Sequence, residues 1–155
     1  MYRLYEIQKF VPIPEGLKMV YMSYQLASIA VKAAVEESKN LNAKMNIAIV
    51  DVGANLVYFV RMDGAYLGSV DISIKKAKTA VLFQRPTGEL GRSSTPGSAE
   101  APLYGIEHSN QGLITFPGGV PIYNNEGHLI GGIGVSGSSV ENDHKVAEAA
   151  INSIE

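Results

Sequence analysis

The sequence predicts an α+β fold, within the broad α/β class, in which a five-stranded, mainly antiparallel sheet carries flanking helices. Apolar residues recur with helical spacing near the start, in the middle and at the end of the chain. The β-rich runs between these segments are mostly joined by turns too short for a parallel crossover. The predicted order is therefore helix, two strands, helix, three strands, helix.

The chain has 155 residues, which is enough for one domain with a substantial core and too few for two of ordinary size. Residues 1–16 contain two prolines and scattered aromatic residues without periodicity, so we expect an extended arm there. Residues 17–155 are expected to form the single domain.

Composition narrows the class of protein. The formal net charge of −2 gives no general attraction for nucleic acid or for an anionic membrane. The absence of cysteine excludes disulfides, thiolate metal ligands and a thiol nucleophile. The N-terminal residues lack the apolar core of a signal peptide, and no apolar run approaches a membrane span, so a soluble cytoplasmic protein is expected.

The first helix and the first two strands follow from the pattern over residues 17–61. Met22, Leu26, Ile29 and Ala33 keep helical spacing, which predicts a helix from residue 17 to about residue 41. The runs MNIAIVD and NLVYFVRMD are joined by VGAN, which favours a hairpin. Both runs are almost wholly apolar, so we expect a sheet covered on both faces.

A second helix is predicted over residues 69–84, where Val70, Ile74, Ala77 and Val81 keep the same spacing. Residues 85–112 contain three prolines and five glycines with no sustained period. We expect a long loop of the kind that serves as a lid, a binding loop or an oligomer contact.

The last third predicts a short strand LITF, a hairpin that turns at residues 124–127, and a final helix. Pro121 cannot donate a ladder hydrogen bond, which places its strand near a sheet edge. Ser138 and Glu141 have the spacing of a capping box at the start of the final helix.

The stretch GIGVSG, residues 132–137, matches the glycine spacing of a dinucleotide-binding turn. Only 18 residues follow it, too few for the βαβ unit that such a turn needs, and no lysine and hydroxyl residue follow as in a P-loop. As a strand, it places Gly132 and Gly134 on one face. A helix, a neighbouring subunit or a flat ligand is expected to press against that bare face, the helix being the simplest reading.

Several ordered stretches resemble a known family: VDVGANLVYFVRMDGA, KKAKTAV, FPGGVPIYNNEGHLIGGIGVSG and VENDHKVAEAA. They are similar to the GlcG/HbpS-like family, also called the haem-binding or "haem-degrading" domain family of unknown-function class 336. The resemblance runs from about Ala30 to the C-terminus. It implies a profilin-like sandwich with a five-stranded antiparallel sheet, usually assembled into homo-oligomers.

The resemblance also directs attention to a set of charged and small residues. Arginine grips a carboxylate with two hydrogen bonds and lysine adds a mobile charge, so these groups could hold a haem or a small acid. An Arg61–Asp63 or Lys76–Asp143 ion pair that only braces the fold is an equal alternative. The positions that match the family motifs are Arg61, Asp63, Lys76, Gly118, Gly119 and Asp143.

A haem would need an axial ligand, and the histidines His108, His128 and His144 are candidates beside methionine and tyrosine. His108 lies in the long loop and is the best placed of the three. No histidine spacing signals a metal cluster. The expected ligand-binding residues are Arg61, Asp63, Lys76, His108, Gly118, Gly119, Gly132, Gly134 and Asp143.

Three functions remain open at this point. The first is a cytoplasmic homo-oligomer that binds a small molecule, with haem or a related tetrapyrrole as the expected ligand. The second is an enzyme acting on a small oxygenated acid or aldehyde, with Lys76 as base or amine nucleophile and Asp143 as its partner. The third is an assembly module without a ligand.

Overall fold

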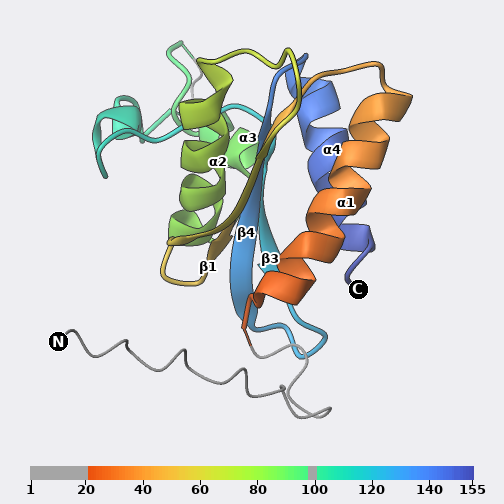
Figure 1. Ribbon diagram of the computed structural model, residues 1–155. Helices are drawn as coiled ribbons and strands as arrows, with labels where there is room; N and C mark the ends of the chain where they lie inside the picture. The colour runs from red at the N-terminus through yellow and green to blue at the C-terminus, as the bar shows by residue number, and fades with distance from the viewer. Residues whose placement is uncertain (1–20, 98–100) are drawn as a thin grey trace, which may run out of the picture.

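The computed structural model describes residues 21–97 and 101–155, and these form three layers with the sheet in the middle (Figure 1). The sheet order is β2-β1-β4-β3, and every neighbouring pair is antiparallel. The predicted arm, residues 1–16, lies outside the described residues. The strands are β1 (Asn46–Asp51), β2 (Leu56–Arg61), β3 (Gly119–Tyr123) and β4 (Leu129–Ser136).

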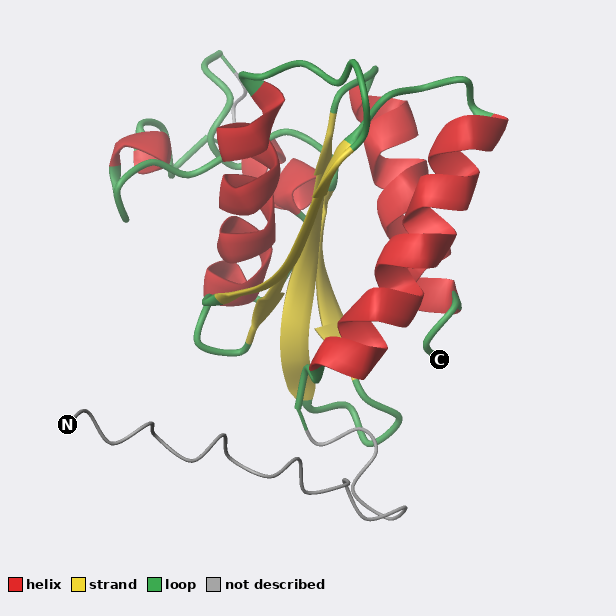
Figure 2. Ribbon diagram, viewed as in Figure 1, coloured by secondary structure: helices red, strands yellow, loops and turns green. Residues whose placement is uncertain are grey.

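Helices cover both faces of the sheet, as the apolar strands predict (Figure 2). α1 (Tyr24–Asn40) and α4 (Val140–Asn152) lie side by side on one face, and α2 (Ser69–Phe83) covers the other. The larger core cluster lies under α1 and α4 and includes Ile47 and Ile133. A smaller cluster under α2 is built around Ala48 and Val81.

The predicted fifth strand, residues 113–116, is wrong: the sheet has four strands among the described residues. The backbone of this segment bonds elsewhere. The N–H of Leu113 donates to the carbonyl of Glu107, and the N–H of Ile114 donates to Oγ1 of Thr79 on α2. The segment therefore packs along α2 instead of extending the sheet, and β3 becomes the edge strand that Pro121 predicts.

The long segment 85–112 is more ordered than predicted. It contains the short helix α3 (Thr87–Arg92) and the 3₁₀ turn η2 (Ile106–His108). Thr87 and Leu90 are buried, so α3 packs into the domain. A run of six residues is too short for periodicity to reveal it, which explains why the pattern missed this helix.

The buried face of α1 also differs from the prediction. Ala27, Ala30 and Ala34 are buried, whereas Ile29 is half exposed at 50%. Small side chains allow α1 to approach the alanines of α4 closely, and this close packing selects the alanine face over the face with the larger apolar residues.

The final helix begins one residue later than the predicted capping box. Ser139 is its N-cap, and Oγ of Ser139 accepts a hydrogen bond from the N–H of Asn142 at 3.3 Å. Ser138 instead accepts from the Asn142 side chain at 3.2 Å.

Candidate functional site

Lys76 and Asp143, 67 positions apart in sequence, meet in the interior. Nζ of Lys76 donates to Oδ2 of Asp143 and to the carbonyl of Val135, both at 2.8 Å. Lys76 is fully buried and Asp143 is 2% exposed. The Phe116 ring covers the ammonium group, with its centroid 4.8 Å from Nζ. The bracing ion pair considered as an alternative for these two residues is therefore present.

Burial shifts both groups toward their neutral forms. Desolvation lowers the pKa of Lys76 and raises that of Asp143, and in each case the partner's charge opposes the shift. The N–H of Ser138 also donates to Oδ1 of Asp143 at 3.1 Å, which favours the carboxylate. Two opposing effects therefore act on the protonation of the pair: burial favours the neutral amine and carboxyl group, and mutual attraction favours the ammonium and the carboxylate.

Two of the predicted glycines enclose this pair. Gly118 has φ +118°, and a side chain there would collide with Nζ of Lys76 and Cβ of Asp143. Gly119 is buried, and its N–H donates to Oγ1 of Thr87 at 3.0 Å. The motif therefore places backbone directly over the buried lysine.

Gly132 and Gly134 do not line a ligand site. A Cβ at Gly134 would overlap the backbone of Ser73 and Ala77 on α2, and one at Gly132 would meet Val81. The helix α2 itself rests on the bare face of β4, as the simplest reading of the sequence expects, so Gly132 and Gly134 are not available to the ligand that they were also expected to bind.

Arg61 and Asp63 do not join the buried pair. Both are exposed at the end of β2, and within the described residues neither side chain forms a hydrogen bond or an ion pair, with each other or with Lys76 and Asp143. Arg61 pairs with Asn46 of β1, and Asn46 pairs on its other side with Ser136 of β4. One strand, β1, therefore separates Arg61 from β4, whose Val135 carbonyl accepts from Lys76.

An open cleft of about 530 Å³ lies against the buried pair; we call it the serine cleft. Figure 1 shows that α2 and α4 begin at the same end of the sheet, and Ser69 and Val140, the first residues of these helices, line the cleft. Asp143 and Phe116 form part of its wall, whereas Lys76 lies behind them. The sequence alone does not point to the serines of this cleft as site residues, because isolated serines near helix starts are ordinary capping residues. The lining residues are Tyr66, Ser69, Ile72, Phe116, Ser136, Gly137, Ser138, Val140 and Asp143.

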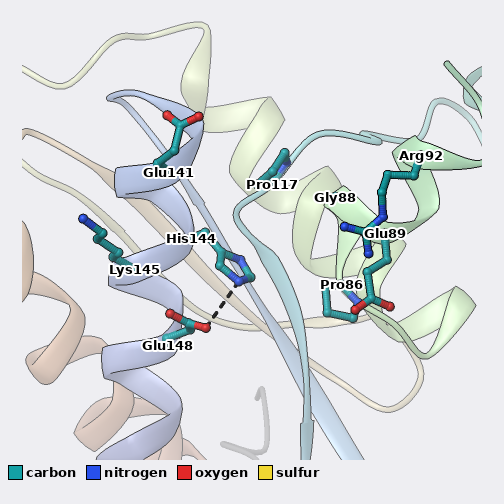
Figure 3. A pocket seen from close by; sticks show the side chains of 9 residues that line it. All are labelled: Pro86, Gly88, Glu89, Arg92, Pro117, Glu141, His144, Lys145 and Glu148. Carbon is teal, nitrogen blue, oxygen red and sulfur yellow. Dashed lines mark ion pairs between the residues drawn. The ribbon is translucent and has the colours of Figure 1, made fainter. Parts of the chain in front are cut away.

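A second cleft of about 440 Å³ separates α4 from α3; we call it the histidine cleft (Figure 3). His144 extends from α4 toward the side on which Pro117 and α3 lie. Nε2 of His144 lies 3.4 Å from Oε1 of Glu148, and its buried Nδ1 has no hydrogen-bond partner among residues 21–97 and 101–155. The lining residues are Pro86, Gly88, Glu89, Arg92, Pro117, Glu141, His144, Lys145 and Glu148.

Two histidines lie elsewhere than the sequence suggested. His108, the best placed of the three by sequence, is exposed on η2, which lies on the outer side of α2 in Figure 1, and it lines neither cleft. His144, a candidate that the sequence did not favour, lines a cleft. No sequence signal separates the two, because only the packing of α3 against the end of β3 creates the cleft.

Residues 21–97 and 101–155 contain no cluster of three or more histidine, aspartate or glutamate residues placed to hold a metal ion. None of the helices found in these ranges combines the length and the apolar character that crossing a bilayer requires.

Fold and site together define the class of protein: a three-layer α+β domain whose central strand carries glycines against one helix, next to a buried lysine–aspartate pair. Residues 22–152 match the family described as "Haem degrading protein HbpS-like". The chain belongs to this family.

Relatives within the family are close. The chain is 38% identical over 138 residues to a 15.0 kDa protein from the dhaT-dhaS intergenic region of Citrobacter freundii, covering 84% of this chain and 94% of that protein. It is 40% identical over 134 residues to the corrinoid adenosyltransferase PduO of the same organism. That match covers 86% of this chain but only 39% of PduO, so the chain spans about two fifths of this relative.

A solved structure agrees with the fold. The crystal structure of a PduOC:haem complex superimposes with a TM-score of 0.81 at 38% identity, covering 88% of this chain and 96% of that chain. The antiparallel sheet with flanking helices is therefore shared with a relative that was crystallised with haem.

Proposed function

We propose that the protein binds haem or a related tetrapyrrole in the histidine cleft. The single observation that carries this proposal is the partnerless Nδ1 of His144 in a residue that lines an open cleft. Membership of a family described as haem-degrading, and a relative solved with haem, support the choice of ligand.

The cleft suits a flat, largely apolar ligand. Pro86, Gly88 and Pro117 offer apolar surface without long side chains, and Arg92 supplies a cation. An arginine at the margin of the cleft fits the carboxylates of a tetrapyrrole. The volume of about 440 Å³ lies within the range typical of small-molecule sites.

His144 has the second-shell arrangement that metal-binding histidines commonly use. A carboxylate beside one ring nitrogen orients the imidazole and raises the basicity of the other nitrogen. Glu148 occupies that position next to Nε2, which leaves the lone pair of Nδ1 for iron after the ring turns into the cleft. When bound, haem would supply the chemistry of its iron; His144 and Arg92 would hold it, through the imidazole and through the haem carboxylates, and Glu148 would position His144.

Haem titration followed by absorbance tests this assignment. We expect a Soret shift at one haem per chain in the wild type and its loss in His144→Ala. Glu148→Gln should weaken haem affinity by about 10-fold to 100-fold. His108→Ala, matched in chemistry but outside the cleft, should bind as the wild type does. Loss of the Soret shift in His108→Ala with retention in His144→Ala would restore the sequence-based prediction and overturn this one.

Homo-oligomer formation and a cytoplasmic location remain part of the proposal. Tyr66 and Leu67 are 73% and 72% exposed, and such large apolar side chains side by side favour a subunit contact. Light scattering after size exclusion tests this, and a monomer at micromolar concentration would contradict it. An assembly module without ligand, the alternative, would form the oligomer yet give no Soret shift.

A further inference from the structure

Lys76 is the largest fully buried side chain of the domain, and haem binding at the histidine cleft does not use it. Its Nζ has two hydrogen-bond acceptors, Asp143 and the carbonyl of Val135. The third side is closed by the Phe116 ring. Phe116 is 41% exposed and also lines the serine cleft, so rotation of this one ring would open Nζ toward the cleft.

The serine cleft is lined by two hydroxyls that a ligand can reach. Ser69 and Ser136 line it and are 8% and 5% exposed. Neither hydroxyl forms a hydrogen bond within the part of the chain that the structure describes, although Ser73 and Thr79 on the same helix α2 as Ser69 both do. Neither oxygen is among the buried polar atoms without a partner in these ranges, so both hydroxyls face the solvent of the cleft. A ligand oxygen in the cleft would accept hydrogen bonds from them.

The helix ends around the cleft add a favourable electrostatic field. Gly68, the N-cap of α2, offers no side-chain hydrogen bond, and the N–H groups of Ser69 and Val70 donate to the carbonyls of Tyr66 and Leu67, both at 3.2 Å. Ser69 lies at this end of α2, and Ser138 and Val140 lie at the start of α4. The positive ends of two helix dipoles favour an electron-rich oxygen at this position.

We propose that the serine cleft binds a small carbonyl compound and that Lys76 forms an imine with its carbonyl carbon when Phe116 turns aside. A carbonyl group matches both features of the site: its oxygen would accept hydrogen bonds from Ser69 and Ser136, and its carbon is electrophilic toward the amine behind Phe116. The inference is independent of haem binding, because it concerns a different cleft.

Lys76 and Asp143 together supply and accept every proton that imine formation requires. In the neutral form, the Lys76 amine adds to the carbonyl carbon, a C–N bond forms, and the C=O π pair moves to oxygen, which takes the proton of the Asp143 carboxyl group. An N–H proton returns to Asp143 and then leaves with the hydroxyl as one water. The product is a protonated imine paired with the Asp143 carboxylate, and no oxidant or reductant is consumed. The lowered pKa of Lys76 and the raised pKa of Asp143 favour the neutral pair that this step needs.

Borohydride trapping followed by peptide mass mapping provides the experiment. The full-length protein is incubated with pyruvate or acetaldehyde and then reduced, and the labelled fraction of each lysine is compared. Lys78, exposed on the same helix, is the internal reference for non-specific reaction. We expect Lys76 to be labelled more than Lys78 despite its burial. Lactate, which has the carboxylate but not the carbonyl carbon, should give no label.

Three variants test the covering ring and the two serine hydroxyls separately, and none of them changes Lys76 or Asp143. Phe116→Ala should speed labelling of Lys76 several-fold, because the covering ring is gone. Ser136→Ala and Ser69→Ala should slow it while leaving Lys78 unchanged. If pyruvate labels Lys76 faster than acetaldehyde does, the site prefers a carboxylate beside the carbonyl; the reverse order indicates an uncharged compound.

Labelling of Lys76 no greater than that of Lys78 in both the wild type and Phe116→Ala would overturn the proposal, as would labelling that is insensitive to both serine variants. Neither result bears on haem binding, which the Soret titration of the same protein reports separately. Lys76→Met is not required for the decision, so a folding defect in that variant leaves the test intact.

Discussion

Asp143→Asn tests the energetic role of the buried pair. The substitution keeps the size of the side chain and leaves an oxygen to accept the Ser138 N–H, but it removes the charge that faces Lys76. The ammonium would then retain only the Val135 carbonyl and the Phe116 ring. Breaking a buried ion pair in this way costs about 3–5 kcal/mol. For a domain of this size, that loss corresponds to a fall in Tm of about 6–20 °C.

The assay is urea unfolding of the haem-free protein by circular dichroism, at a fixed chain concentration because subunit association would add stability. Lys75→Met is the matched control. Lys75 pairs with Asp71 at the surface, at 2.9 Å with side chains 33% and 69% exposed. Its loss should cost at most about 1 kcal/mol. The double variant Lys76→Met, Asp143→Asn should be more stable than Asp143→Asn alone, since no unpaired charge remains.

The pH dependence of the stability of Asp143→Asn provides a second test of the same reasoning. Without its counter-ion, Lys76 has a folded-state pKa even further below the ordinary lysine value of 10.5. Between those two pKa values the unfolded chain binds more protons, so the stability of Asp143→Asn should rise with pH and approach that of the wild type. A variant within about 0.5 kcal/mol of wild type at neutral pH, with no such rise, would refute the reasoning from burial.

Three other predictions concern single contacts. Gly134→Ala should destabilise the domain by about 1–3 kcal/mol or more in urea unfolding, because the new methyl overlaps the α2 backbone, whereas Gly68→Ala, with open space around it, should be near neutral. Ser139→Ala should cost about 1 kcal/mol and Ser138→Ala clearly less; the opposite order would restore the predicted capping box. Glu107 has its pKa lowered below 4.5 by its own backbone N–H and by the Ser94 and Thr115 hydroxyls, so its contribution is present above about pH 4.5 and is lost as the pH falls through the lower folded-state pKa. The hydrogen-exchange protection factors of residues 106–117, corrected for the intrinsic pH dependence of amide exchange, should therefore fall in acid in the wild type and depend less on pH in Glu107→Gln; equal profiles would contradict this role.

The sequence by itself determined the elements with strong periodicity and clear turn residues. The second helix was predicted over 69–84 and is found at Ser69–Phe83, and both hairpins turn where expected. The edge position of the Pro121 strand and the family membership were also predicted correctly. These features depend on local backbone preferences or on ordered motifs, which a single sequence displays.

The tertiary structure decided the features that depend on distant packing. Residues 113–116 look like a strand, but Thr79 and Glu107 accept their N–H groups, so the sheet ends at four strands in the described region. The alanine face of α1 is buried because α4 lies close to it. Neither the position of residues 113–116 nor the buried face of α1 can be predicted from the spacing of apolar residues along the sequence.

The candidate site was likewise predicted in part by the sequence and decided in part by the tertiary structure. The motifs singled out Lys76, Asp143, Gly118 and Gly119, and the structure brings all four together. Arg61 and Asp63 lie apart from them because the order of the strands, not the sequence, sets which ends are neighbours. The two clefts, with Ser69 and Ser136 lining one and His144 lining the other, are formed only by the folded chain, because their walls come from segments that are far apart in sequence.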